Sequence, residues 1–210
     1  MNVESFAVGP LGCICSIVFD PVAKKAIVVD PGGNFEQIRA RLESHGLGVV
    51  AIVHTHTHID HVGATAPLQR LSGARASIHE ADRFLYDILP IQAAMIGCAV
   101  PEKTELDGSL VDGTSLHAGD VEMGVLHTPG HTPGSVSFVV RDGGATRVFT
   151  GDTLFRRGIG RTDLWGGDSS LIARSLRDKL LTLPDDAIVV PGHGGTTTIG
   201  EERRMNPFLA

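Results

Sequence analysis

The sequence predicts an α/β protein whose residues 1–210 form a single domain. The first observation is a set of apolar runs separated by Gly, Pro and Asp turn signals, which is typical of neighbouring strands; these runs cover residues 2–8, 13–19 and 25–30. The second observation is that a similar set follows in the second half, at residues 121–126, 135–140, 147–150 and 187–190. Because no linker or low-complexity segment separates the sets, we predict two related halves of one domain.

Helical periodicity lies between these strands. Phe35, Ile38 and Leu42 recur at helical spacing after Asn34, which suits a helix N-cap, and Gly46 follows as the stop signal. Further helices are expected at residues 64–71, 81–89, 168–181 and 201–205, and a short strand at 76–78. The continuous apolar run at 49–53 predicts a strand buried on both faces. Residues 90–109 are expected to be irregular, either a surface loop or a mobile flap.

Composition excludes several functional classes. The formal net charge is -6 and basic residues are scattered, so no nucleic-acid partner is expected. No apolar run approaches the roughly 18 residues of a membrane helix, and the N-terminus lacks a signal peptide. Cys13, Cys15 and Cys98 are expected to be buried free thiols, with the first two on one face of a strand. We therefore predict a cytoplasmic protein without membrane partners, either a monomer or a small homo-oligomer.

One short segment, residues 55–61, carries three imidazoles and a carboxylate. Imidazole and carboxylate are the side chains that bind zinc, iron and manganese. In an extended segment alternate side chains point the same way, so His56, His58 and Asp60 are expected to converge. His61 would then point toward a neighbouring position, and the segment could serve two adjacent metal ions. The competing interpretation is a His-rich polar loop.

Four apolar strands end just before a residue that can bind a metal: His56, His131, Asp152 and His193. In sheets flanked by helices, binding sites collect at the strand ends. Glycines beside these candidates are expected to let the backbone turn sharply; they are Gly130, Gly151 and Gly192. The two oxygens of Asp152 could bridge two cations.

The remaining histidines and hydroxyl groups are given structural interpretations. We expect His54 to be a core residue behind the metal ligands and His127 to be a structural neighbour of His131. Three further histidines are expected to be solvated or locally bonded: His45, His79 and His117. Ser135 and Thr132 have no base paired with them in sequence context, so a serine nucleophile is the weaker hypothesis.

Four motifs together resemble the metallo-β-lactamase superfamily, and within it the glyoxalase II-like (hydroxyacylglutathione hydrolase-like) group. They are T-H-x-H-x-D-H at 55–61, G-H-T-P-G-S at 130–135, T-G-D-T-L-F at 150–155 and P-G-H-G at 191–194. The resemblance extends from about Val3 to Leu209. It implies a four-layer αββα sandwich with a dinuclear metal centre between the sheets.

The resemblance also assigns ligands. His56, His58 and His131 would hold the first metal, and the second would be held by Asp60, His61 and His193, with Asp152 bridging the two. Two divalent ions are implied, zinc first, with iron or manganese as alternatives. Arg161 would bind the anionic end of the substrate, unless it forms a structural salt bridge to Asp163 or Asp168. Glyoxalase II has a C-terminal helical region that helps to bind glutathione; the present sequence ends at Ala210 without it, which leaves the glutathione requirement open.

The implied activity is hydrolysis of a hydroxyacylglutathione-like thioester by a hydroxide that bridges the two metals. Asp60 and Asp152 would orient the hydroxide, and no protein nucleophile would be needed. The first alternative is a persulfide (sulfur) dioxygenase with a single iron. A lactonase, a β-lactamase or another acyl hydrolase could use the same metals. A metal-binding regulatory protein without turnover is the alternative from a different class.

Overall fold

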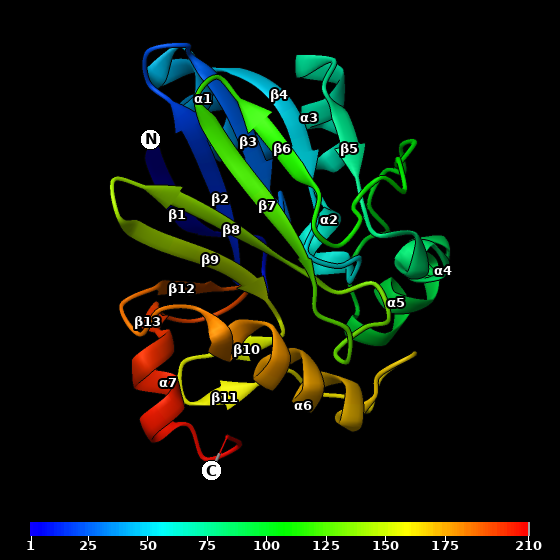
Figure 1. Cartoon of the computed structure of the whole chain (residues 1–210). Coiled ribbons are helices and arrows are strands. Elements are labelled where there is room, and N and C mark those ends of the chain that lie inside the picture. Colours follow the sequence, from blue (N-terminus) through cyan, green and yellow to red (C-terminus); the bar gives the residue numbers. More distant parts are fainter. Residues whose placement is uncertain (210) are drawn as a thin grey trace.

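Two β-sheets lie face to face in the computed structural model, which describes residues 1–209 (Figure 1). The first sheet has the strand order β1-β2-β3-β4-β5. Its strands are β1 (Asn2–Val8), β2 (Cys13–Asp20), β3 (Lys25–Val29), β4 (Gly48–Val53) and β5 (Arg75–Ser77). β1, β2 and β3 form the expected antiparallel meander, whereas β3, β4 and β5 are parallel. Parallel neighbours need crossover connections, and helices supply them.

The second sheet has the order β13-β12-β9-β8-β7-β6. Its strands are β6 (Ser115–Ala118), β7 (Val121–His127), β8 (Val136–Asp142), β9 (Ala145–Gly151), β12 (Ile188–Pro191) and β13 (Thr197–Thr198). β6 to β9 are antiparallel neighbours, and β12 pairs with β9 in parallel. A small hairpin of β10 (Leu154–Phe155) and β11 (Gly158–Ile159) follows β9.

Helices lie on the outer faces of the two sheets (Figure 1). They are α1 (Phe35–His45), α2 (Ile59–Val62), α3 (Thr65–Ser72), α4 (Arg83–Asp87), α5 (Leu89–Ile96), α6 (Ser169–Asp178) and α7 (Ile199–Met205). Three buried apolar clusters separate the layers. One includes Ile38 and Leu68 of the helices over the first sheet, one includes Phe138 between the sheets, and one includes Ile172 of α6. Three interfaces define four layers, so the predicted αββα sandwich is confirmed.

Because side chains alternate along a strand, one strand contributes residues to two apolar clusters. Ile17 of β2 packs in the cluster under the helices, and its neighbour Val18 packs in the cluster between the sheets. β3 divides in the same way, because Val28 faces the helices and Ile27 faces the second sheet. Successive side chains of a strand point to opposite faces, so a strand covered on both sides must be apolar throughout. Continuous apolar runs therefore marked these central strands correctly.

Some sequence expectations are wrong in detail. Residues 90–96 are helical, as part of α5, rather than irregular. Pro90 does not prevent the helix because it lies in the first turn, where its missing N–H has no helical partner to lose. The helix expected at 81–89 is divided into a 3₁₀ turn at Glu80–Asp82, α4 and the start of α5.

Two further expectations also need correction. The apolar run of β4 is not buried throughout, since Val50 is 38% exposed. Only the end that leads to the candidate ligands at residues 55–61 is fully covered, at Ile52 and Val53. α6 ends at Asp178 rather than at residue 181. The short strands β6, β10 and β11 were not expected, because two to four residues carry too little periodicity to be recognised.

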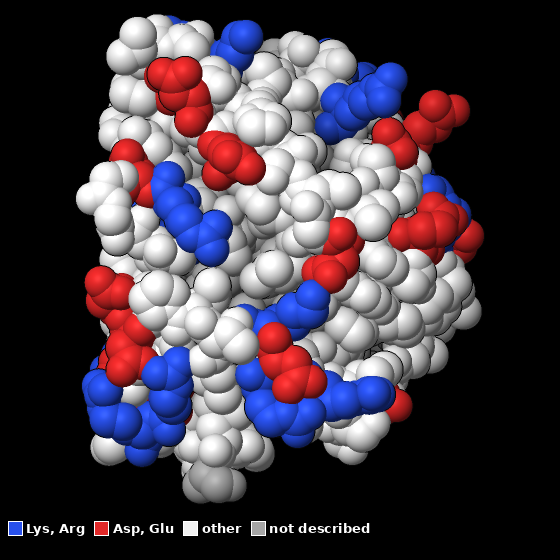
Figure 2. Space-filling view, viewed as in Figure 1, with Lys and Arg blue, Asp and Glu red and all other residues white. Residues whose placement is uncertain are grey.

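Surface charge is mixed rather than clustered on the face that Figure 2 shows. Lys and Arg side chains lie beside Asp and Glu side chains on this face. Among the ion pairs of the structure, Lys179 Nζ lies 2.7 Å from Asp112 Oδ2. Within residues 1–209, no helix has both the length and the apolarity needed to cross a membrane.

Candidate metal centre

The segment after β4 changes from extended backbone to helix within a few residues. His58 is still extended, with φ -65° and ψ 147°, and α2 begins at the next residue. The helical turn carries Asp60 away from His56 and His58. The expectation that these three side chains converge is therefore wrong: it assumed that the segment stays extended through Asp60, and it does not. Asp60 instead lies with His61 and His193.

The first group of candidate ligands contains His56, His58 and His131. One ring nitrogen from each lies within 4.8 Å of the others, and His131 Nε2 is 2.9 Å from His58 Nδ1. His131 comes from the loop after β7, so the group joins the ends of strands from both sheets. All three side chains are buried.

The second group contains Asp60, His61 and His193. The Oδ2 atom of Asp60 is 3.0 Å from His193 Nε2 and 3.7 Å from His61 Nε2. His193 follows β12 and is more open than the other imidazoles, with 28% of its side chain exposed. This group therefore forms the accessible side of the centre.

Asp152 lies between the two groups. Its Oδ1 atom is 3.4 Å from His61 Nε2. Its Oδ2 atom is 3.6 Å from His131 Nε2 and 3.8 Å from His193 Nε2. One carboxylate thus faces nitrogens of both groups, as a bridging ligand requires.

Unsatisfied polar atoms show that this arrangement fits cations. Four buried atoms have no hydrogen-bond partner in residues 1–209: His56 Nε2, His58 Nε2, His61 Nε2 and Asp152 Oδ1. A buried polar atom without a partner costs on the order of 1–3 kcal/mol, and all four atoms belong to the two groups or to the residue between them. Metal ions would satisfy them, and nitrogen and oxygen donors suit zinc, iron and manganese.

Neighbouring groups orient three of the imidazoles through Nδ1, so Nε2 is the ring nitrogen of each that could bind a metal. His61 Nδ1 donates to Asp30 at 3.0 Å, and His131 Nδ1 donates to the backbone carbonyl of Arg161 at 2.8 Å. His56 Nδ1 lies 3.1 Å from Thr55 Oγ1. Asp30 also accepts from the backbone N–H of Thr55 at 2.7 Å and so fixes the start of the segment.

In the first group, electrostatics favour the neutral form of imidazole, which is the form that binds a metal. Burial lowers the pKa of His56 well below its usual value and lowers the pKa of His58 to about 3. Burial also lowers the pKa of His131. These imidazoles are therefore neutral near neutral pH, and one ring nitrogen of each has a lone pair for a cation. Burial opposes ionisation of Asp152, but the charge and the hydrogen bond of His61 outweigh it and lower its pKa, so the carboxylate is charged.

The sequence profile of the metallo-beta-lactamase superfamily matches residues 8–193, which include every residue of both groups and Asp152. The chain belongs to the metallo-β-lactamase superfamily. "Hydroxyacylglutathione hydrolase GloC" of Haemophilus influenzae is 40% identical to it, with 100% of this chain and 98% of the relative covered. "Persulfide dioxygenase ETHE1, mitochondrial" of Homo sapiens is 31% identical, over 95% of this chain and 73% of the relative. The crystal structure of TTHA1623 in a di-iron-bound form superposes with a TM-score of 0.88 at 38% identity, covering 98% of this chain and 100% of that one.

Sequence reasoning missed several residues that support this metallo-β-lactamase centre. Asp30 and Asp82 are buried carboxylates that bond to the metal-binding loops, and Gln92 of α5 accepts from the backbone N–H of Ile59 at 2.9 Å. The strand-end argument could have found Asp30, because it directly follows β3. Asp82 and Gln92 lie on helical segments distant in sequence, where no local signal marks them.

The interpretations of the other histidines agree with the structure. His54 is buried, and its Nδ1 lies 3.2 Å from the backbone carbonyl of His61. His127 donates to the carbonyl of Pro133 at 2.9 Å and stacks on His79, with ring centroids 4.0 Å apart. Neither His127 nor His79 belongs to a candidate metal group within residues 1–209.

The structure tests the expected turns at three glycines and the expected burial of three cysteines. Gly130 and Gly151 have positive φ of 138° and 48°, as expected for sharp turns. Gly192 instead provides space, because a Cβ there would lie 2.1 Å from Asp152 Oδ1. Cys13 and Cys15 are buried on one face of β2, whereas Cys98 is only half-buried, so its expected burial is wrong.

Arg161 contacts the centre through its backbone rather than its side chain. Its guanidinium makes two bonds to Asp163, of 2.7 Å and 2.8 Å. This is the salt bridge that was the alternative to substrate binding. Both side chains are more than half exposed, so the pair can exchange partners at low cost.

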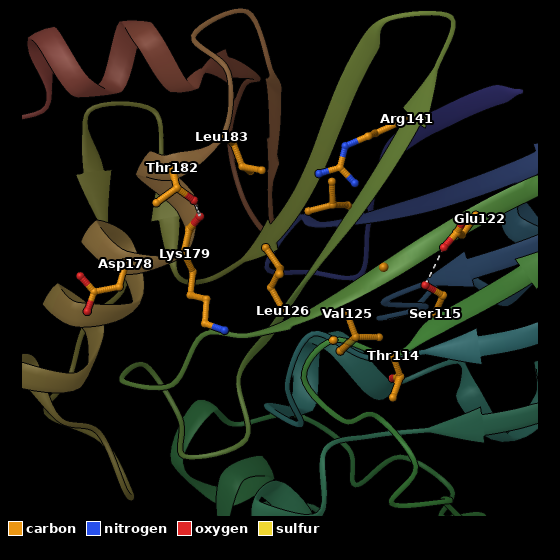
Figure 3. Close-up of a pocket in the computed structure, with 13 residues that line it drawn as sticks. Thr114, Ser115, Glu122, Val125, Leu126, Arg141, Asp178, Lys179, Thr182 and Leu183 are labelled. Atoms are coloured by element: carbon orange, nitrogen blue, oxygen red, sulfur yellow. Dashed lines mark hydrogen bonds between the residues drawn. The ribbon is translucent and has the colours of Figure 1, made fainter.

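A groove of about 450 Å³ lies elsewhere, on the outer face of the second sheet beside the end of α6. Figure 3 shows Arg141 and Lys179 on either side of it, with Leu126 between them. None of its lining residues belongs to the two ligand groups. The groove is therefore separate from the metal centre.

Proposed function

We propose that this protein is a dinuclear metal-dependent hydrolase that cleaves hydroxyacylglutathione-like thioesters. The observation that carries the proposal is the pair of ligand groups that share Asp152. Seven candidate ligands are too many for one tetrahedral ion. The relative of Haemophilus influenzae named a hydroxyacylglutathione hydrolase supports the substrate class.

In this proposal His56, His58 and His131 would hold the first ion, Asp60, His61 and His193 would hold the second, and Asp152 would be shared by both. Two divalent cations, with zinc as the preferred metal, would lower the pKa of a shared water and polarise the substrate carbonyl. The carboxylates of Asp60 and Asp152 accept hydrogen bonds from the attacking water and orient it. His193, on the exposed side, marks where substrate enters.

A covalent acyl-enzyme is not part of the proposal, because no side chain near the centre is an activated nucleophile. Ser135 Oγ lies 2.7 Å from Thr132 Oγ1, and no imidazole contacts it in residues 1–209. Burial raises the pKa of the Cys13 thiol to about 11 and also raises that of Cys15. Both thiols therefore stay protonated and unreactive near neutral pH.

The test is hydrolysis of lactoylglutathione, simple thioesters and lactones by protein loaded with zinc, iron or manganese, with metal analysis of the same samples. In ¹⁸O-labelled water, a single turnover should place the label in the product acid. Trapping an acyl-enzyme would overturn the mechanism, and thioesters that remain intact with every metal would overturn the substrate class.

The alternative with support of its own is a persulfide dioxygenase, since the human relative carries that name. The two functions differ in metal content and in co-substrate. A dioxygenase should bind one iron and consume oxygen with glutathione persulfide, whereas the proposed hydrolase should bind two ions and consume none. A saturated protein with a single iron would favour the alternative.

Arg161 is proposed to bind the anionic end of the substrate by exchanging Asp163 for a substrate carboxylate. Arg161→Ala should then raise KM several-fold for a carboxylate-bearing thioester, because the substrate carboxylate would lose a charged hydrogen-bond donor that water partly screens. Steady-state kinetics on charged and neutral thioesters measure this. Asp163→Ala is the matched control, since it frees Arg161 and should not raise KM. Equal losses on both substrates would assign Arg161 to structure.

The proposal also covers location and assembly. A cytoplasmic protein, monomeric or a small homo-oligomer, is consistent with three free cysteines and the mixed surface charge. Size-exclusion chromatography with light scattering would measure the assembly.

A further inference from the structure

Asp82 is a buried carboxylate that contacts both loops of the first ligand group. It ends the 3₁₀ turn at Glu80–Asp82, and 1% of the residue is exposed. Its Oδ2 atom accepts from the backbone N–H of Thr57 at 3.2 Å and from Thr132 Oγ1 at 2.8 Å, and its Oδ1 atom accepts from the backbone N–H of Gly134 at 2.5 Å. Thr57 lies between His56 and His58, and Thr132 follows His131.

These contacts join segments that are distant in sequence. His58 and His131 are 73 positions apart, and each is on a loop rather than within a strand. One backbone bond, from Val136 N–H to the Thr55 carbonyl at 2.8 Å, joins the same two loops. Asp82 adds three side-chain bonds between the two loops, and Thr57 Oγ1 donates to its carbonyl at 2.9 Å. Both loops thus form hydrogen bonds to a single residue, Asp82, which is not itself a candidate metal ligand.

The loops fit closely around this carboxylate. A Cβ at Gly134 would lie 2.6 Å from Asp82 Oδ1, so the chain can approach only because this residue is glycine. No Lys or Arg pairs with Asp82 within residues 1–209. Burial raises its pKa to about 6, although the hydrogen bonds from Thr132, Gly134 and Thr57 favour the charged form. A carboxylate buried without a cation is unfavourable for stability, so stability alone does not account for its place here.

We propose that Asp82 is a positioning residue that fixes the distance between His56 and His58 on one loop and His131 on the other, and thereby sets the metal affinity of the first ligand group. The proposal depends on the metal-binding part of the proposed function and not on its substrate. Outer partners of metal ligands typically change metal affinity by about 10- to 100-fold. Asp82 acts one step further out, through the backbone of the ligand loops, so the expected effect is near the lower end of that range.

The competing interpretation is that Asp82 only stabilises the fold. Asp20 offers a matched control, because it too is a buried carboxylate that accepts three hydrogen bonds. Its donors are the backbone N–H groups of Val22, Ala23 and Asp120, at 2.8 Å, 3.0 Å and 2.8 Å. They join turns that are not part of the metal centre. Asp20→Asn should therefore lower stability without changing metal affinity.

The test measures zinc affinity by competition with a chromophoric chelator in an Asp60→Ala background, where the second group is disabled and the first group remains. Adding Asp82→Asn should weaken zinc binding by about tenfold or more, and adding Thr132→Val should weaken it by a smaller factor. Adding Asp20→Asn should leave the affinity within twofold. The melting temperature of each metal-free protein reports the fold separately.

Each outcome decides the proposal. Unchanged zinc affinity in Asp82→Asn, or a loss no larger than in Asp20→Asn, would overturn it. If Asp82→Asn does not fold, Thr132→Val decides, since it removes one bond without changing the charge. A wild-type protein that binds zinc but leaves every thioester intact would overturn the proposed substrate while the role of Asp82 could still be measured. A wild-type protein that binds none of zinc, iron and manganese would overturn both.

Discussion

Asp152→Ala should lower thioester hydrolysis by more than about 100-fold and should weaken the binding of both metal ions. The expected effect is this large because Asp152 faces both ligand groups, with Oδ1 3.4 Å from His61 and Oδ2 3.6 Å from His131. Loss of a residue that hydrogen-bonds to a metal ligand lowers metal affinity or activity by about 10- to 100-fold. Loss of a ligand shared by both ions should lower them further. Removing the carboxylate would also leave the first group with three neutral imidazoles and no negatively charged ligand.

Metal analysis and steady-state kinetics on the same samples check this prediction. Asp60→Ala is the informative comparison, because Asp60 belongs to one group only. It should lower the occupancy of the second ion more than that of the first. Asp178→Ala is the control, since Asp178 pairs with Arg177 on the surface of α6 and should change neither quantity. Equal ion content in wild type and Asp152→Ala would contradict the bridging role.

Gly32→Ala is expected to damage the centre although Gly32 is not a ligand. Its backbone packs against the carbonyl of Asp60, and a Cβ at this position would lie 1.7 Å from that oxygen. The clash involves backbone rather than a flexible side-chain end, so α2 must move. Overpacking of this kind costs about 1–3 kcal/mol, and the displaced Asp60 and His61 should bind the second ion weakly. Thermal unfolding and metal analysis measure the two effects.

Gly48→Ala separates this steric effect from the general cost of replacing a glycine. Gly48 opens β4, and a Cβ there would make an ordinary contact of 3.7 Å with the carbonyl of Lys24. Neither Gly32 nor Gly48 has positive φ, so neither substitution adds backbone strain of that kind. The control variant should keep both ions and most of the wild-type stability. A Gly32→Ala protein with two ions and wild-type melting would show that the loop can move aside freely.

The sequence was sufficient to predict those features that depend on residues close together along the chain. Strands buried on both faces produced continuous apolar runs, as Ile27 and Val28 illustrate by facing different cores. Strand ends located the candidate ligands His131, Asp152 and His193, because sites collect where strands stop. That these residues bind metal stays a prediction, which the geometry supports through their convergence.

Other features depend on contacts that no local pattern contains. Alternation predicted that Asp60 would lie with His56, but α2 starts at Ile59 and turns it toward His193. The motif resemblance, by contrast, assigned Asp60 to the second group, where the structure brings it beside His193. The role of Asp82 could not be predicted from the sequence for a different reason. Its partners Thr57 and Thr132 are distant in sequence, and only the packed structure brings them together.

The division of the ligands between the two sheets has a thermodynamic consequence. The residues from His56 to His61 follow β4 of the first sheet, whereas His131, Asp152 and His193 follow strands of the second. Bound ions would therefore act as cross-links between the two halves of the sandwich. By mass action, free metal at 100 times its dissociation constant would add about 2.7 kcal/mol per site to the free energy of unfolding. The melting temperature should then rise with metal concentration, and chelators should make the two sheets easier to separate.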